Sequence, residues 1–310
     1  MKIVTSGFPY IDIDAYACCI AYTELLNLRG EAAQAVSTSL LNESITPTVR
    51  GWKAPLATTY KPSEQDTYVL VDVSDPDHFD TFVGVERVAE VIDHHPGLET
   101  FWLERIGRKA QIDFIGAACT QVYENWKAAG ALDKMSLTSA RLLVCGILDN
   151  TLNFGAKVST PRDKAAYEAL LSRAKLPADW TATYFSECQA SILANPKTAI
   201  KNDTKLLRFA SFDPDAALAA GQLVAWDGRQ VLGQYLDILK HAMDSTAPKS
   251  KWFINMVSIE EGRSYFVSDN GAVRAWLTRL LGVTFEGAVA TSNRLWLRKE
   301  IVKEDTKRRG

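Results

Sequence analysis

The chain has 310 residues, of which 47% are apolar, and its formal net charge at pH 7 is −2. This length is sufficient for two domains with sizeable cores. A net charge near zero argues against a broad nucleic-acid or membrane surface. The five cysteines form no CxxC pair, which is typical of reduced thiols in a cytoplasmic protein. We expect no signal peptide, and no apolar run approaches the roughly 20 residues of a membrane span.

The first part of the chain alternates β-branched runs with stretches of helical periodicity. We expect strands at residues 2–5, 67–73 and 87–92, and helices at 15–29, 116–129, 137–148 and 162–173. Strands that alternate with helices in this way favour a parallel sheet covered on both faces. The fold class is therefore α/β, with the sheet flanked by helices.

A second, smaller α/β unit is expected after a proline-containing hinge near residues 190–198. The predicted domains are residues 1–190 and 198–310. In the second domain we expect strands at 222–226, 252–259, 263–267, 287–290 and 295–302, and helices at 230–243 and 271–281.

Carboxylates and imidazoles stand where three of the predicted strands end. They are Asp12, Asp14, Asp72, Asp93, His94 and His95. Because neighbouring parallel strands end at one crevice of an open sheet, these side chains should converge. Carboxylate oxygens and imidazole nitrogens suit manganese or magnesium, so the pattern indicates a metal-dependent hydrolase.

The individual motifs differ in strength. The Asp12-Ile13-Asp14 segment is weak alone, and a role of Asp12 as a helix cap has about equal weight. Asp72 follows a buried strand, where a carboxylate is costly unless it is paired or bound to a metal. Asp75 is the better candidate for a cap in the following loop.

Asp93-His94-His95 is the strongest single signal, because it contains two of the four histidines in the chain. One histidine could bind a metal while Asp93 orients a ring, and the other could contact the substrate. His78 and His241 lack such neighbours and are expected to be ordinary surface or partly buried residues.

Two further segments leave alternatives open. An apolar helix runs into residues 149–154, where Asp149 could bind a metal or the polar residues could simply end the helix. Small residues at 116–120 open another helix, whose free amide groups could hold a phosphate. Close packing of small residues explains the latter segment at least as well.

These motifs together resemble the DHH phosphoesterase superfamily, and most closely its branch of manganese-dependent (family II) inorganic pyrophosphatases and exopolyphosphatases. The resemblance covers nearly the whole chain. Its motifs are Asp12-Ile13-Asp14, Val71-Asp72, Asp93-His94-His95, the segment 149–154, Asp203-Thr204-Lys205 and Arg298-Lys299.

The resemblance implies a two-metal site between the domains and a mobile second domain that brings basic residues onto the phosphates. For this chain we expect one or two Mn²⁺ or Mg²⁺ ions. The implied metal ligands are Asp12, Asp14, Asp72, His94 and Asp149. The implied catalytic residues are Asp72, Asp93 and His95, with His95, Lys205, Arg298 and Lys299 binding the substrate. In this scheme Asp72 bridges the two metals.

Two positions depart from the family pattern. Phe8 stands where the family has a histidine, four residues before Asp12, and Asn150 stands directly before Thr151, where the family has an aspartate. Both changes fall on the same implied metal, so the first site is reduced to Asp12 and Asp72, with Asp149 left open as a third ligand.

The expected reaction is attack of water on a phosphoanhydride, with pyrophosphate or a short polyphosphate as the substrate. Two alternatives stay open: a phosphodiesterase for short oligonucleotides or cyclic dinucleotides, and a binding protein that holds a phosphorylated ligand without turnover. The expected partner is a small phosphate-containing molecule, without a broad nucleic-acid surface or a membrane. A homodimer is left open.

Overall fold

A computed structural model describes residues 1–213, 217–247 and 251–307. The chain forms two compact units. The first contains Met1–Phe154 and Val158–Trp180, and the second contains Gly155–Lys157 and Thr181–Gly310. The expected hinge at residues 190–198 covers the end of one helix, α7 (Trp180–Ala194), and the start of the next, α8 (Pro196–Asn202). The domain limits 1–190 and 198–310 therefore remain a prediction.

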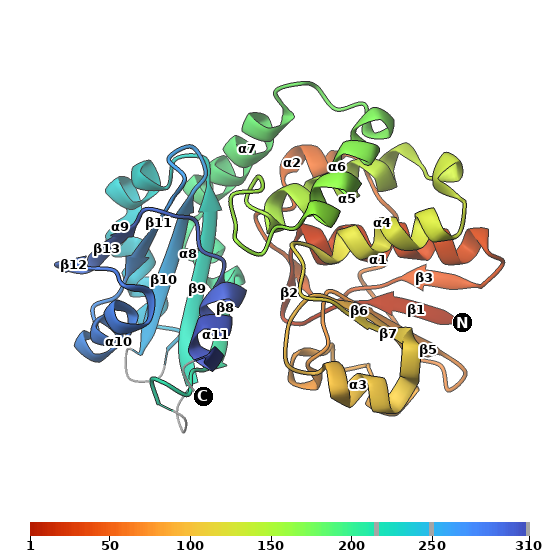
Figure 1. The fold of residues 1–310 in the computed structure, drawn as a ribbon, viewed down its shortest axis with the longest axis horizontal. Coiled ribbons are helices and arrows are strands. Elements are labelled where there is room, and N and C mark those ends of the chain that lie inside the picture. Colours follow the sequence, from red (N-terminus) through yellow and green to blue (C-terminus); the bar gives the residue numbers. More distant parts are fainter. Residues whose placement is uncertain (214–216, 248–250, 308–310) are drawn as a thin grey trace. The chain divides into compact units, whose positions relative to one another are not determined.

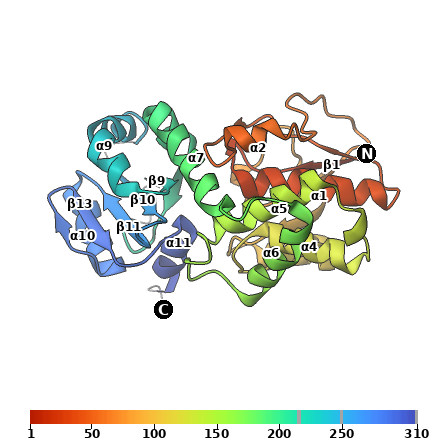
Figure 2. The ribbon, with the colours of Figure 1, turned by 90° about the horizontal axis from the view of Figure 1, so that it is seen from above.

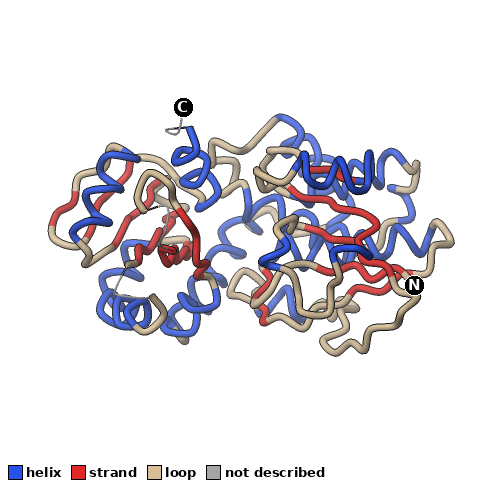
Figure 3. Tube along the Cα trace, turned by 90° about the horizontal axis from the view of Figure 1, so that it is seen from below, coloured by secondary structure: helices blue, strands red, loops and turns tan. Residues whose placement is uncertain are grey.

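The first unit contains a five-stranded sheet in the order β3-β1-β5-β6-β7, in which all neighbours are parallel. Figure 3 shows its strands in red. The strands are β1 (Lys2–Thr5), β3 (Ala33–Ala35), β5 (Thr67–Val71), β6 (Val88–Asp93) and β7 (Ala110–Ile112); β2 (Tyr10–Ile11) and β4 (Leu40–Leu41) form a separate parallel pair.

Helices cover both faces of this sheet, as expected from the sequence. α1 and α4 lie on one side and α3 lies on the other (Figure 1). α5 packs on α1, and α6 packs on α5. The helices are α1 (Ile13–Leu28), α2 (Pro47–Gly51), α3 (Glu99–Ile106), α4 (Ala118–Ala128), α5 (Leu137–Asn150) and α6 (Pro161–Ala174).

The order of the strands fixes where a ligand can bind. From β1 the chain crosses through α1 to β3 on one side, and it then returns to β5 on the other side of β1. In parallel sheets, ligands bind beyond the carboxyl ends of the strands at such a switch point. The segments after β1 and β5 contain Asp12, Asp14 and Asp72. The topology thus places these carboxylates at the expected edge.

The second unit is built on a six-stranded mixed sheet in the order β12-β13-β11-β10-β9-β8, in which only β9 and β10 are parallel. Its strands are β8 (Thr204–Arg208), β9 (Ala217–Ala225), β10 (Trp252–Ser258), β11 (Arg263–Val267), β12 (Phe285–Glu286) and β13 (Val289–Ser292). Its longer helices after α8 are α9 (Gly228–Asp244), α10 (Gly271–Leu281) and α11 (Arg298–Lys307).

The central strand β10 is buried along its whole length because helices cover both faces of the sheet. Alternate residues of a strand point to opposite faces. Ile254 and Met256 accordingly pack in the core beneath α9, whereas Phe253 contacts Phe209 and Trp276 beneath α10. Figure 2 shows α9 and α10 on opposite sides of β10.

The α/β fold class is confirmed, and most expected elements occur within a few residues of their predicted limits. One expectation was wrong: residues 295–302 do not form a strand, because helix α11 starts at Arg298. A short apolar run such as Leu295-Trp296-Leu297 does not distinguish a strand from the approach to a helix. Within the described ranges, no helix is both long and apolar enough to cross a membrane.

Candidate metal centre

Asp12 and Asp14 have different surroundings although they are two residues apart. Asp12 is the N-cap of α1, and its Oδ1 accepts a hydrogen bond from Ala15 N at 3.0 Å. The capping role that the sequence left open for Asp12 is therefore present. Asp14 lies in the first turn of α1 and is completely buried.

The carboxylate of Asp14 is held by the N-terminus of α4. Its Oδ2 accepts a hydrogen bond from Ala118 N, and its Oδ1 accepts one from Cys119 N, both at 2.8 Å. Unpaired N–H groups and the helix dipole favour a negative charge at this position. The two amide groups thus fix the position of the Asp14 carboxyl group in the interior.

A second buried carboxylate, that of Asp163, binds the two main-chain amides that precede Ala118 in the chain. It accepts hydrogen bonds from Gly116 N at 3.0 Å and Ala117 N at 3.3 Å, and also from the hydroxyl of Thr120. A Cβ added to Gly116 would lie 2.7 Å from the Asp163 carboxyl, so this approach requires glycine. The amides at 116–119, which we expected could hold a phosphate, therefore donate to side chains of the protein itself.

Sequence reasoning missed Asp163, although a local signal was present. Thr160 is the N-cap of α6 and forms a capping box with Asp163 three residues later. That motif predicts the start of a helix. It does not show that the same carboxylate reaches the end of α4.

Asp72 stands directly after β5, in a left-handed backbone conformation with φ of 56°. Its N–H donates to Ile92 O of the neighbouring β6 at 2.8 Å, which fixes the turn. The side chain is 6% exposed, and its Oδ1 lies 3.0 Å from Nε2 of the buried His94. The end of β5 thus directs Asp72 toward the end of β6.

Asp93 organises the two histidines that follow it. Its Oδ1 accepts hydrogen bonds from His94 N at 2.7 Å and from Nδ1 of His95 at 2.8 Å. Burial acts to raise the pKa of the Asp93 carboxyl, but the charge of His95 and hydrogen bonds from His95, Ser74 and the His94 backbone outweigh it. The net pKa is below its ordinary value, so Asp93 is a carboxylate at neutral pH.

The structure brings several of the expected ligands together. The donor atoms of Asp72, His94 and His95 lie within 4.8 Å of one another. His94 Nε2 also lies 3.6 Å from Asp14 Oδ2. Carboxylate oxygens around an imidazole nitrogen form a donor set that fits Mn²⁺. Asp14, Asp72 and His94 are therefore suited to hold one ion.

The residues expected at a first metal are less concentrated. Among the described residues, neither group whose donor atoms lie within 4.8 Å of one another includes Asp12 or Asp149. Asp149 and Asn150 are the last two residues of α5. Phe8 is 44% exposed. The main-chain carbonyl of Ile147 accepts a hydrogen bond from the Thr151 hydroxyl at 2.7 Å, as expected of a polar helix end.

The basic residues of the second unit are close to one another. Lys205 pairs in register with Ala220, whose carbonyl accepts a hydrogen bond from Arg298 Nη1 at 3.1 Å. Arg298 also forms an ion pair of 2.8 Å with Asp203. The neighbouring Lys299 is buried. The structure thus groups Lys205 and Arg298 within this unit.

No protein-family model matches the chain. A probable manganese-dependent inorganic pyrophosphatase of Lactobacillus acidophilus is 26% identical over 167 residues, which are 53% of this chain and 52% of that protein. A protein of the same name from Lactobacillus delbrueckii subsp. bulgaricus is 25% identical over 171 residues, 54% of each chain. The chain thus matches about half the length of these curated relatives.

Solved structures extend the similarity to the whole fold. A putative family II inorganic pyrophosphatase from Methanococcus jannaschii has a TM-score of 0.76 at 18% identity, covering 99% of this chain and 100% of that one. An exopolyphosphatase-related protein from Bacteroides fragilis has a TM-score of 0.52 at 13% identity, covering 99% and 90%. Fold and site therefore define a two-unit α/β protein with carboxylate and imidazole groups at a parallel sheet edge. The expected resemblance to manganese-dependent (family II) inorganic pyrophosphatases is confirmed.

Proposed function

We propose that the protein is a metal-dependent hydrolase of phosphoanhydride bonds that acts on pyrophosphate or a short polyphosphate. The observation that carries the proposal is the buried constellation of Asp14, Asp72 and His94. Buried carboxylates are retained where they are paired or bind a cation. The names of the relatives, which are manganese-dependent pyrophosphatases, support Mn²⁺ as the cation.

In this proposal the residues of the chain have separate tasks. Asp14, Asp72 and His94 would hold the ion, and Asp12, Asp72 and Asp149 would hold a second ion if one binds. Bound Mn²⁺ or Mg²⁺ supplies a Lewis acid that lowers the pKa of water and offsets charge on the phosphates. Asp14 is positioned for its task by the two amides of α4.

Asp93 and His95 act on the substrate side. Because the Nδ1–H of His95 donates to Asp93, Nε2 is the ring atom that can contact a phosphate oxygen. The imidazole is 36% exposed, so it is accessible to a ligand, whereas His94 is fully buried. Lys205, Arg298 and Lys299 complete the proposed set by binding phosphate oxygens, which accept several hydrogen bonds from basic groups.

The direct test is release of phosphate from pyrophosphate and tripolyphosphate by the metal-depleted protein, before and after addition of Mn²⁺ or Mg²⁺. We expect activity that a chelator abolishes and that Asp72→Asn lacks. Hydrolysis of a dinucleotide at a higher kcat/KM than pyrophosphate would contradict the proposed substrate class. The matched control is His241→Ala, which alters an exposed histidine of the second unit.

A non-catalytic phosphate-binding protein is the second candidate, and Phe8 and Asn150 favour it. Equilibrium dialysis with pyrophosphate and Mn²⁺ separates the two functions. Metal-dependent binding without any phosphate release, at every Mn²⁺ concentration tried, would establish the binding protein and exclude the hydrolase.

A further inference from the structure

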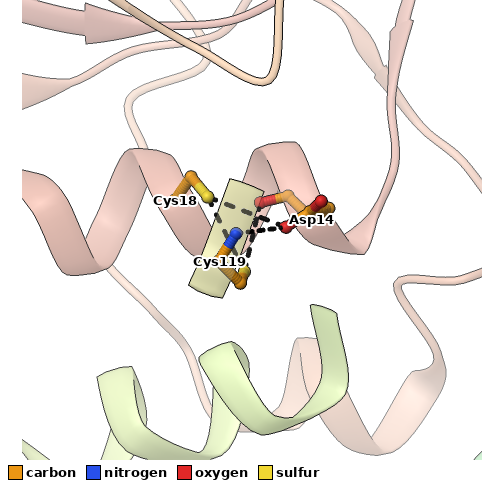
Figure 4. Close-up of side chains that lie close together, drawn as sticks. All are labelled: Asp14, Cys18 and Cys119. Carbon is orange, nitrogen blue, oxygen red and sulfur yellow. Dashed lines mark hydrogen bonds between the residues drawn. The ribbon is translucent and has the colours of Figure 1, made fainter. Parts of the chain in front are cut away.

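Two cysteines from different helices meet at the carboxylate of Asp14 (Figure 4). Cys18 comes from α1 and Cys119 from α4, and their Sγ atoms lie 3.6 Å apart. Cys18 Sγ also lies 3.7 Å from Asp14 Oδ1. Cys119 Sγ lies 3.7 Å from the main-chain oxygen of Asp14. Each of the three residues offers one ligand atom, and these three atoms lie within 4.8 Å of one another.

The fold makes specific room for this cluster. A Cβ on Gly146 of α5 would lie 2.4 Å from Cys119 Sγ and 3.3 Å from Asp14 Oδ1. Glycine at this position lets α5 approach while the sulfur keeps its place. Cys18, Cys119 and Asp14 are all completely buried, so the cluster is a group of interior donors rather than a surface patch.

The spacing of the donors agrees with a small tetrahedral cation. Zn–S bonds of about 2.3 Å and Zn–O bonds of about 2.0–2.2 Å place neighbouring donors of a tetrahedral site about 3.5–3.8 Å apart. The observed separations of 3.6 Å between the sulfurs and 3.7 Å between sulfur and oxygen lie in this range. Thiolates select soft or borderline ions, whereas Mn²⁺ prefers oxygen and nitrogen.

We propose that Cys18, Cys119 and Asp14 form a second cation site, specific for a soft or borderline divalent ion such as Zn²⁺ or Cd²⁺. Binding replaces the two thiol protons, which are released to solvent, and a water or the main-chain oxygen of Asp14 completes the coordination. Without such an ion the same pairs are S–H···O and S–H···S contacts. Because the thiols are buried, an ion enters only when α1 and α4 separate locally, so binding is slow.

The consequence for activity rests on the proposed function. Asp14 belongs to both donor sets, since its Oδ2 lies 3.6 Å from His94 and its Oδ1 3.7 Å from Cys18. A soft ion that draws the carboxylate toward the sulfurs weakens the Asp14–Asp72–His94 site. Zn²⁺ or Cd²⁺ is therefore expected to inhibit slowly, through loss of bound Mn²⁺.

The test is titration of the full chain with Cd²⁺ while following the ultraviolet charge-transfer absorption of cadmium thiolates. We expect one Cd²⁺ per chain with this absorption, and release of two protons per ion. Cys18→Ser and Cys119→Ser should each lose most of the absorption. Cys19→Ala is the matched control, because Cys19 is equally buried and adjacent on the same helix but does not belong to the cluster.

Absence of the absorption in the unaltered protein would overturn the site, whatever the variants do and whether or not the protein hydrolyses pyrophosphate. Retention of the absorption in both serine variants would overturn it equally. The link to activity has its own measurement: Mn²⁺ bound per chain, with and without Cd²⁺. Unchanged Mn²⁺ content beside bound Cd²⁺ would refute the competition for Asp14.

Discussion

Asp14 of the first unit and two acidic side chains of the second unit have different partners. In the second unit, Asp203 pairs with Arg298 at 2.8 Å and Glu300 pairs with Arg294 at 3.2 Å. In the first unit, the contacts described for Asp14 come from main-chain amides, a thiol and an imidazole. A guanidinium neutralises a carboxylate with its own positive charge, whereas neutral amide groups orient the carboxylate without neutralising it. We take this difference to distinguish the two arginine-paired acids, which stabilise the fold, from Asp14 as a proposed metal ligand.

The strongest challenge to this distinction is His94→Ala. Removal of the buried imidazole takes one ligand from the proposed ion, and even the loss of groups that only support a ligand costs roughly 10–100-fold in affinity. We expect a larger loss of Mn²⁺ affinity, with loss of phosphate release. Electron paramagnetic resonance of free Mn²⁺ measures it. Full metal content and full activity in the variant would refute the assignment.

A paired substitution compares two buried carboxylates, one in each unit, that accept hydrogen bonds from main-chain amides. Asp163 accepts hydrogen bonds from two amides of the α4 terminus, and Asp305 likewise accepts bonds from Ala210 N at 2.8 Å and Ser211 N at 3.1 Å. Asp163→Asn and Asp305→Asn should each lower the free energy of unfolding by about 1–3 kcal/mol. Only Asp163→Asn should weaken Mn²⁺ binding, by about tenfold, because it loosens the helix end that holds Asp14.

Urea unfolding and Mn²⁺ titration, performed on both variants, separate these effects. Unchanged Mn²⁺ affinity in both variants would show that Asp163 stabilises the fold without positioning Asp14. A fall in affinity for Asp305→Asn as well would show that the loss follows general destabilisation.

Arg298→Ala tests the assignment of a residue of the second unit to substrate binding rather than to metal binding. Arg298 donates to Asp203 O at 2.8 Å as well as to its carboxylate, so its removal leaves an acid that is 18% exposed with less compensation. We expect a KM for pyrophosphate about tenfold higher, consistent with loss of a charged hydrogen bond of roughly 1.5 kcal/mol, and unchanged Mn²⁺ affinity. Small-angle scattering with metal and a phosphate analogue tests the expected closure, and no compaction together with an unchanged KM would exclude this role.

Phe8→His tests whether the first metal site binds its ion weakly because Phe8 replaces the histidine of the family pattern. The phenyl ring is 44% exposed, so the change should alter the unfolding free energy by less than about 0.5 kcal/mol. We expect hydrolysis by the unaltered protein to saturate only at high Mn²⁺, and the variant to saturate several-fold lower.

Asp149→Asn should remove that gain, whereas Asn150→Ala should preserve it. Asp149 lies three residues after Gly146, so Asp149 and Gly146 lie on one face of α5. Gly146 is the residue of α5 that approaches Asp14. No additional Mn²⁺ bound by Phe8→His would mean that the segment 8–14 is aligned wrongly with the family motif. Rapid pyrophosphate hydrolysis at micromolar Mn²⁺ before any substitution would refute a weakened first site.

The smallest effect concerns Glu261, an acid of the second unit that contacts two hydroxyl groups and an arginine. Burial acts to raise its pKa, but hydrogen bonds from Tyr265 at 2.7 Å and Ser258 at 2.9 Å and the charge of Arg229 outweigh it, so the net pKa is lowered. Its contribution to stability is therefore present at neutral pH and is lost as the pH falls below about 4.5, toward the lowered value.

Glu261→Gln should lower the unfolding free energy by about 1 kcal/mol at pH 7 and by less at acid pH. Thermal unfolding at a series of pH values measures this. A difference that stays constant down to pH 3 would show that the charge of Glu261 does not matter. Added Mn²⁺ should leave the difference unchanged, in contrast to the effects at Asp163.

The sequence predicted those parts of the site that local patterns determine. Asp72 and Asp93 were found because each ends a β-branched run, and parallel strands share an edge. The positions of Asp163 and Cys119 could not be found in this way. Cys119 and Asp14 are 105 residues apart, and their contact depends on how α1 packs against α4. Helical periodicity predicts that such helices pack, but not which side chains meet.

The segment 149–154 shows the same limit from the other side. Its polar residues allowed either a ligand or a helix end. The structure places Thr151 at a helix end, and the ligand role of Asp149 stays a prediction. Composition cannot separate these roles, because the same side chains perform both.

The backbone of Asp72 has a further consequence. Left-handed conformations at residues other than glycine cost on the order of 1 kcal/mol or more, and aspartate tolerates them better than branched residues do. The protein therefore holds its proposed bridging ligand at the expense of intrinsic fold stability. Glycine at this position would suit the turn better and bind no metal. Selection for thermal stability alone would then favour glycine at this position. An aspartate kept among related proteins would therefore indicate selection for metal binding.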